Sequence, residues 1–224
     1  MRAMLVALLT VVVLAAPTMA FPPEDTDLRP GDAIGSPAFC TIGFFLRGPG
    51  GEVYAATAGH CVASRVGDEV RNADFPTIGT VVRAWDEPGT FDFGFILLAS
   101  DVPWDAEIRE IGGPTGHVTD PLSTPLGAPL KTFGHGLPDS SSGRAKDGVL
   151  LTDDASSFTW AAATTPGDSG GPVILADSGL LLGIVADAAP LKDRVGTDVG
   201  PTVKAILDRM ASAGFPASLA TAEP

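Results

Sequence analysis

Residues 91–98 read FDFGFILL, an apolar run that predicts a β-strand. Alternation along a strand would place Phe91, Phe93 and Phe95 on one face and Asp92 on the other. Because burying an unpaired carboxylate is unfavourable, we expect Asp92 to have a hydrogen-bond donor as its partner. A histidine ring N–H is a natural candidate. The alternative is an acid at the strand end that reaches water.

Further apolar runs of strand length lie on both sides of this segment. They cover residues 39–46, 53–57, 80–84, 130–133, 149–152, 158–161, 172–175 and 180–186. The 27 Gly and 20 Pro argue against a helical bundle, since both residues interrupt helices, and they suit short strands joined by turns. One helix is predicted over 201–214, with Pro201 at its first position and Gly214 as its cap. The pattern indicates an all-β sandwich or barrels with a C-terminal helix.

The balance of charges narrows the range of partners. Of the 224 residues, 14 are Lys or Arg and 27 are Asp or Glu, which gives a formal net charge of -13. A nucleic-acid binder needs a cationic surface, and an anionic membrane surface would repel this chain. We therefore expect no nucleic acid and no membrane as a partner. The two cysteines and three histidines lack a zinc-binding spacing and no calcium-loop pattern is evident, so no metal and no other cofactor is expected.

Residues 1–20 have the layout of a secretory signal peptide. Arg2 precedes the apolar run 4–16, which as a helix would span about 20 Å, whereas a bilayer core needs about 30 Å. Small residues at 18 and 20, the positions that a signal peptidase reads, suit cleavage before Phe21. We expect an exported monomer, located outside the cell or in the space of the cell envelope.

Cys40 and Cys61 are the only two cysteines of the chain. An oxidising compartment favours a disulfide between them. Such a bond would close a loop of roughly 20 residues and contribute on the order of 3 kcal/mol to stability. Two buried free thiols are the alternative.

Residues 167–172 read GDSGGP, which places Ser169 among glycines. Glycine permits a tight turn and the close approach of a ligand backbone. The N–H groups of Gly167 and Ser169 can then point to one site, as in an oxyanion hole. A plain glycine-rich turn is the alternative. The nucleophile elbow of α/β-hydrolases is excluded, because that fold needs a histidine after the serine and the last histidine is His135.

Residues 57–61 read TAGHC, which puts His60 at the end of an apolar strand and next to the expected disulfide. A disulfide holds the backbone in place, which suits a general base whose ring must reach a serine oxygen. A structural histidine is the alternative for this motif taken alone. His117 and His135 lie in Gly- and Pro-rich connections and are expected in loops.

The three motifs occur in the order His60, Asp92, Ser169, which is the order of the chymotrypsin triad. The sequence resembles trypsin-like serine proteases from about residue 31 to 210, and above all the bacterial streptogrisin and α-lytic branch. The resemblance is carried by GDAI at 31–34, CTIGF at 40–44, TAGHC at 57–61, DFG at 92–94 and PGDSGGP at 166–172.

This resemblance implies two six-stranded antiparallel β-barrels with the active site between them. The expected layout is a signal peptide 1–20, a short segment 21–30, a first barrel 31–112, a connection 113–129, a second barrel 130–200, a helix 201–214 and a tail 215–224. The implied activity is hydrolysis of peptide bonds in a polypeptide through an acyl-enzyme intermediate. Ser169 would be the nucleophile and His60 its general base, with Asp92 orienting the ring.

Alignment with the family on the serine motif also predicts the substrate pocket. The residues expected there are Ala163, Thr164, Thr165, Ala186, Asp187 and Ala188. None of the first three is acidic, so a preference for Arg or Lys has no support at that position. We expect small or medium apolar side chains, with a basic residue attracted by Asp187 as the alternative.

Several residues depart from the family pattern. Ala186 replaces a serine whose hydroxyl usually supports the catalytic aspartate, and Ala188 replaces a glycine. The long folding prosegment common in this branch is not apparent before residue 31. Asp168 is expected to need an internal cation, which Lys131 would supply unless it is an ordinary surface lysine. These departures leave two alternatives, an inactive exported pseudoprotease that acts as a binding module and a processing protease with one dedicated substrate.

Overall fold

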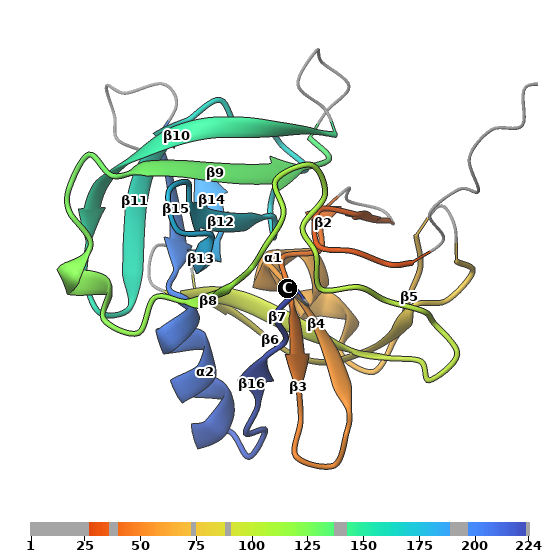
Figure 1. The fold of residues 1–224 in the computed structure, drawn as a ribbon. Coiled ribbons are helices and arrows are strands. Elements are labelled where there is room, and N and C mark those ends of the chain that lie inside the picture. Colours follow the sequence, from red (N-terminus) through yellow and green to blue (C-terminus); the bar gives the residue numbers. More distant parts are fainter. Residues whose placement is uncertain are drawn as a thin grey trace, which may run out of the picture.

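The computed structural model describes residues 27–35, 40–72, 75–87, 91–136, 143–188 and 197–222. The expected signal peptide 1–20 lies outside the described residues, as do residues 21–26 of the segment after it and residue 39 of the first expected strand. Strands dominate the described chain and form two large curled sheets that pack against each other and one small two-stranded sheet, with helix α2 alongside (Figure 1). The expected all-β fold with a C-terminal helix is confirmed.

The first sheet contains six strands in the order β16-β3-β4-β7-β6-β5, and each neighbouring pair is antiparallel. The strands are β3 (Phe45–Arg47), β4 (Val53–Thr57), β5 (Glu69–Val70), β6 (Gly79–Glu87), β7 (Phe91–Leu98) and β16 (Ser218–Leu219). Strand β16 comes from the expected tail 215–224 and returns to pair with β3. The chain terminus therefore closes one edge of the first sheet.

The expected strand 39–46 is divided in the structure. Its first part, β2 (Cys40–Thr41), pairs with β1 (Ala33–Ile34) in a separate two-stranded sheet. The N–H of Gly43 already donates to the carbonyl of Ala56 on β4 at 2.7 Å. The chain thus changes its pairing partner at this glycine, which an unbroken apolar run does not reveal.

The second sheet has the order β14-β15-β11-β10-β9-β12-β13-β8. Its strands are β8 (Gly116–His117), β9 (Pro129–Gly134), β10 (Arg144–Asp153), β11 (Ser157–Ala162), β12 (Pro172–Leu175), β13 (Leu180–Ile184), β14 (Asp187–Ala188) and β15 (Thr197–Pro201). Two-residue strands at both ends, β8 and β14, bring the described sheet to eight strands where six are expected. His117 lies in one of these strands, β8, instead of in a loop.

Four short helical segments are described, namely α1 (Gly59–Val62), the 3-10 turns η1 (Ala63–Arg65) and η2 (Pro121–Ser123), and α2 (Val203–Ser212). Helix α2 begins at Val203 and not at Pro201, because Pro201 is still part of β15. The Thr202 hydroxyl caps the helix by accepting from the N–H of Ala205 at 3.2 Å. No helix in the described ranges has the length and hydropathy needed to cross a membrane.

Strand β7 is buried on both faces, with the alternation that its sequence predicts. Phe91, Phe93 and Phe95 pack into a cluster that also contains side chains of the second sheet and of α2, whereas Ile96 packs into a separate cluster of the first sheet. The stacked rings of Phe93 and Phe95 lie 6.0 Å apart. This packing holds β7, and with it Asp92, at the junction of the two sheets.

Candidate active site

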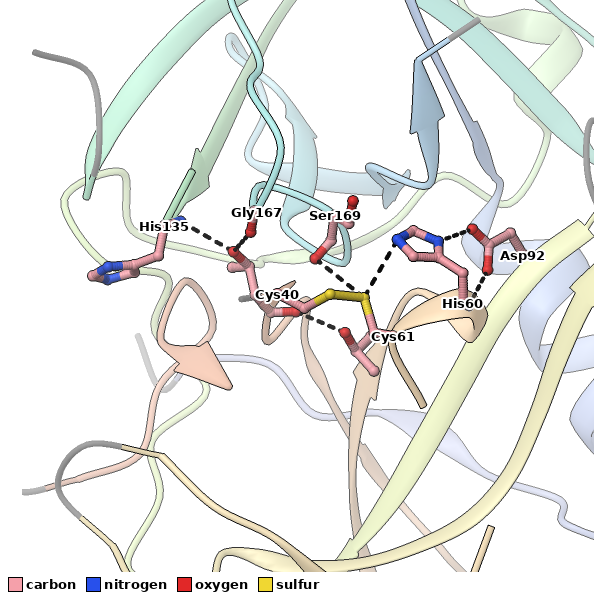
Figure 2. Close-up of a disulfide and its surroundings, with 9 residues drawn as sticks. Cys40, His60, Cys61, Asp92, His135, Gly167 and Ser169 are labelled. Atoms are coloured by element: carbon pink, nitrogen blue, oxygen red, sulfur yellow. Dashed lines mark hydrogen bonds and ion pairs between the residues drawn. A yellow bond between two sulfur atoms is a disulfide. The ribbon is translucent and has the colours of Figure 1, made fainter. Parts of the chain in front are cut away.

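His60 and Asp92 come from neighbouring elements, the helical turn α1 and strand β7 of the first sheet. Strand β4 ends at Thr57, and the single turn α1 then places His60 over β7, which carries Asp92. Nδ1 of His60 lies 2.6 Å from Oδ2 of Asp92, and the His60 backbone N–H donates to Oδ1 at 2.8 Å (Figure 2). The Asp92 side chain is only 9% exposed, so these two bonds provide the partners that a buried carboxylate needs.

The close approach of α1 to the sheet depends on Gly59. A Cβ atom at this position would lie 1.9 Å from the carbonyl oxygen of Trp85 and 2.8 Å from Oδ1 of Asp92. Both distances are far below van der Waals contact. A glycine one residue before His60 therefore allows the hydrogen bonds between His60 and Asp92.

The surrounding acids raise the pKa of His60 above its ordinary value. The hydrogen bond with Asp92 is the largest cause, and partial burial opposes it. The negative charges of Asp92, Asp86 and Asp187 raise the pKa further. The site therefore favours the imidazolium form of His60.

Ser169 lies in the turn between β11 and β12. Gly167 and Gly170 have φ angles of 108° and 92°, a left-handed region that glycine adopts without strain. A Cβ atom on Gly170 would lie 2.2 Å from the carbonyl oxygen of Thr41, so the turn approaches β2 very closely. The N–H of Thr41 also donates to the carbonyl of Ser169 at 2.8 Å. These contacts hold the serine turn against the first half of the chain.

Asp168, the residue before Ser169, anchors the same turn to the second sheet. Its carboxylate forms an ion pair with Lys146 of β10, and the two side chains are 1% and 3% exposed. Oδ1 of Asp168 also accepts from the N–H of Gly136 at 3.0 Å, and Oδ2 accepts from the N–H of Thr165 at 2.7 Å. The carboxylate is thus well provided with donors, as burial demands.

The internal cation is Lys146, and the expectation that Lys131 supplies it is wrong. In the antiparallel β9–β10 ladder, Lys131 is paired with Asp147 and Lys146 with Thr132. Directly opposed residues share a face, and successive residues alternate, so the two lysines point to opposite faces of the sheet. Only the sheet face that carries the Lys146 side chain is directed toward Asp168.

The expected disulfide between Cys40 and Cys61 is confirmed, and it joins β2 to α1. Sγ of Cys61 lies 3.6 Å from Nε2 of His60 and 4.0 Å from the carbonyl oxygen of Ser169. The disulfide therefore touches both the histidine and the serine turn (Figure 2).

Figure 2 shows Asp92 at the Nδ1 edge of the His60 ring and Ser169 near its Nε2 edge. Within the described parts of the chain, the Ser169 hydroxyl makes no hydrogen bond. The backbone N–H groups of Gly167 and Ser169 likewise have no acceptor among the described residues. Two donors and one hydroxyl in the same turn are thus available to a ligand.

A cavity of about 320 Å³ opens beside His60 and Ser169. Of the residues expected at a substrate pocket, Thr164, Thr165, Ala186 and Asp187 line it. Ala163 is exposed and does not contribute to the lining, and the side chain of Ala188 lies outside what the structure describes.

Sequence reasoning missed Asp198, which lines the same cavity from β15. The strand reads TDVGP and has no apolar run or alternation that would have predicted it. The position of Asp198 beside the cavity follows only from the pairing of β15 with β11 and β14.

No protein-family model and no curated protein sequence matches the chain. Solved structures of bacterial serine proteases do match. Thermobifida fusca protease A aligns with a TM-score of 0.63 at 20% identity, covering 85% of this chain and 98% of that one. Nocardiopsis protease aligns with a TM-score of 0.65 at 20% identity, covering 86% of this chain and 98% of that one. Cellulomonas bogoriensis chymotrypsin aligns with a TM-score of 0.61 at 22% identity, covering 87% of this chain and 98% of that one. The chain shares the fold of these bacterial proteases, as the resemblance implied.

Proposed function

We propose that this protein is a serine endopeptidase that hydrolyses peptide bonds through His60, Asp92 and Ser169. The observation that carries the proposal is the hydrogen bond between Nδ1 of His60 and Asp92, with Ser169 near the opposite edge of the ring. A ring that donates from Nδ1 keeps a lone pair on Nε2, which is what a general base for a serine hydroxyl requires.

In the proposed reaction, Oγ of Ser169 attacks the carbonyl carbon of the peptide bond while Nε2 of His60 takes the hydroxyl proton. The carbonyl oxygen becomes an oxyanion, which accepts hydrogen bonds from the N–H groups of Gly167 and Ser169. When the C–N bond breaks, His60 gives its proton to the leaving amine. Water then attacks the acyl-enzyme with the help of the same base, which releases the acid and restores Ser169.

Asp92 acts on the ring and does not touch the substrate in this scheme. It keeps the proton on Nδ1 and stabilises the imidazolium that forms during attack. Its Oδ1 atom also accepts a hydrogen bond from the His60 backbone N–H, which fixes the position from which the His60 side chain extends.

We also propose that the protein works after export. The disulfide between Cys40 and Cys61 supports this, because such bonds persist in oxidising compartments. The expected leader 1–20 points the same way.

Ala186 favours the pseudoprotease alternative. Its backbone N–H donates to the carbonyl of Val199, and its methyl side chain offers Asp92 no hydroxyl. The carboxylate of Asp92 consequently receives hydrogen bonds only from His60 among the described residues. This alternative predicts a folded chain whose serine is not activated.

Labelling with a fluorophosphonate probe at pH 8 separates the two functions. We expect the exported chain to be labelled and the Ser169→Ala variant to remain unlabelled. Ser157→Ala is the matched control, because Ser157 lines the same cavity but its hydroxyl donates to Asp154. Labelling that persists in Ser169→Ala, or a folded wild-type chain that is not labelled, would contradict the peptidase proposal.

A further inference from the structure

Asp198 is a buried acid that the proposed reaction does not use. It lies opposite Trp160 in the β11–β15 ladder, is 4% exposed, and lines the same cavity as Ser169. Within the described ranges, its Oδ2 atom has no hydrogen-bond partner. A buried carboxylate oxygen without a donor is unfavourable, and such an atom in a folded protein requires an explanation.

The charges around Asp198 do not neutralise it. Burial is the main cause that raises its pKa, and a hydrogen bond from Thr164 opposes this effect. Asp168 and Asp187 raise the pKa further by repulsion, while Lys146 lowers it. Because Lys146 already forms the buried ion pair with Asp168, its charge is shared with another acid. Among the residues that the structure describes, Asp198 therefore has no counter-ion of its own.

The cavity as a whole is acidic. Its lining includes Asp86, Asp92, Asp187 and Asp198, whereas no Lys or Arg among the described residues contributes to it. His60 balances Asp92 through their hydrogen bond, so the remaining acids are left to attract a positive charge. Low-dielectric walls strengthen such an attraction relative to water.

A metal ion does not account for this arrangement. In the described parts of the chain, the one group of three potential metal ligands close enough to share an ion is Cys40, His60 and Cys61. Both of these sulfurs belong to the disulfide and are not available as thiolates. No comparable group of described residues surrounds Asp198, so the cation that it fits is an organic one with its own hydrogen-bond donors.

We propose that Asp198 is the specificity-determining residue of this site and that it pairs with the Lys or Arg side chain of a polypeptide substrate. The inference rests on the proposed peptidase function and deepens it. The substrate residue just before the cleaved bond extends from the carbonyl attacked by Ser169 into the cavity. Its ammonium or guanidinium group donates to the unpaired Oδ2 of Asp198, with Thr164 beside it.

This assignment differs from the apolar preference that residues 163–165 predict. The segment before the serine motif carries no charge, and the charge instead comes from β15 on the neighbouring side of the cavity. It also differs from attraction by Asp187, which is exposed to water and therefore screened.

The test uses fluorogenic peptides that differ only in the residue before the cleaved bond, with Lys, Arg, Ala, Leu or Glu at that position. We expect kcat/KM for Lys or Arg to exceed that for Ala and Leu by about 100-fold or more, as for a buried charge pair. Asp198→Asn should abolish this advantage. Asp187→Asn is the matched contrast, and it should keep the preference for basic residues.

Fluorophosphonate labelling of the same variants separates failure of this inference from failure of the peptidase proposal. A labelled wild-type enzyme that prefers Ala, Leu or Glu would overturn the role of Asp198 and leave the peptidase intact. If the wild-type chain is not labelled, calorimetry with benzamidine, an aromatic cation, still tests whether Asp198 pairs with a positive charge. Binding to the wild type that is lost in Asp198→Asn supports the pairing, and equal binding or none in both chains overturns it.

Discussion

Lys146 and Asp168 form a buried ion pair directly beneath the turn that presents Ser169, and they link that turn to strand β10 of the second sheet. The pair is inaccessible to solvent, and backbone N–H groups of Gly136 and Thr165 complete the bonding of the carboxylate. The position of the serine therefore depends on a lysine that is remote from it in sequence.

Replacing Lys146 by methionine should destabilise the fold by about 3–5 kcal/mol, because it leaves the Asp168 carboxylate buried without its cation. Urea unfolding at pH 7 measures the loss. Lys131→Met is the control on the neighbouring strand, with an expected change within about 0.5 kcal/mol. Equal losses in the two variants would show that the ion pair is not what stabilises the turn.

The raised pKa of His60 should appear in the pH dependence of catalysis. Only neutral His60 can accept the Ser169 proton, so kcat/KM should fall as the pH drops through a value above 6.5, the pKa of free histidine. Asp92→Asn removes the largest cause of the raised pKa and should lower kcat by about 10⁴-fold. A pH-rate profile between pH 5 and 9 measures both effects.

Asp86→Asn is the matched variant for this profile, because Asp86 raises the pKa of His60 by charge and makes no bond to the ring. We expect its acid limb to move to lower pH than that of the wild type. A wild-type limb centred below pH 6.5 would be incompatible with the site electrostatics described above.

Gly59→Ala should damage both the fold and the activity. The added Cβ must displace the carbonyl of Trp85, which lies 1.9 Å away, and overpacking of this kind removes about 1–3 kcal/mol or more of stability. Gly35→Ala provides the control, since a Cβ there meets no atom within 4 Å. Thermal unfolding and fluorophosphonate labelling of both variants measure the difference in stability and activity between Gly59→Ala and Gly35→Ala. Equal stability and labelling of the two variants would show that α1 can move away from β6 without damage.

Asp198→Asn should raise the stability of the free enzyme at pH 7. With its pKa raised in the native state, Asp198 holds its proton to higher pH when folded than when unfolded, so its ionisation destabilises the fold as the pH rises. The melting temperature of the variant should exceed that of the wild type at pH 7, and the gap should shrink toward pH 4. The exposed acid Asp177 offers a control substitution, Asp177→Asn, for which no gap is expected.

The features that sequence predicts well in this protein are local ones. The alternation of residues 91–98 predicts the strand β7 and the separation of its aromatic face from Asp92. Glycines around Ser169 predict a tight turn, because left-handed φ angles are accessible to few other residues. The two cysteines can pair only with each other within the chain, so an oxidising compartment predicts the disulfide between Cys40 and Cys61 that the structure contains.

Pairing between distant strands decided what the sequence left open. The β9–β10 register turns Lys146 toward Asp168 and Lys131 away from it, although the family resemblance points to Lys131. The pairing of β15 with β11 and β14 brings Asp198 to the cavity from a strand with no apolar signature. A shift by one residue would reverse each of these faces, and the register depends on the partner strand and the connecting turn as well as on the residue pattern of the strand itself. The sequence alone thus determined the central strand β7, the serine turn and the one possible pairing of the cysteines, whereas the tertiary structure decided which charges face the site.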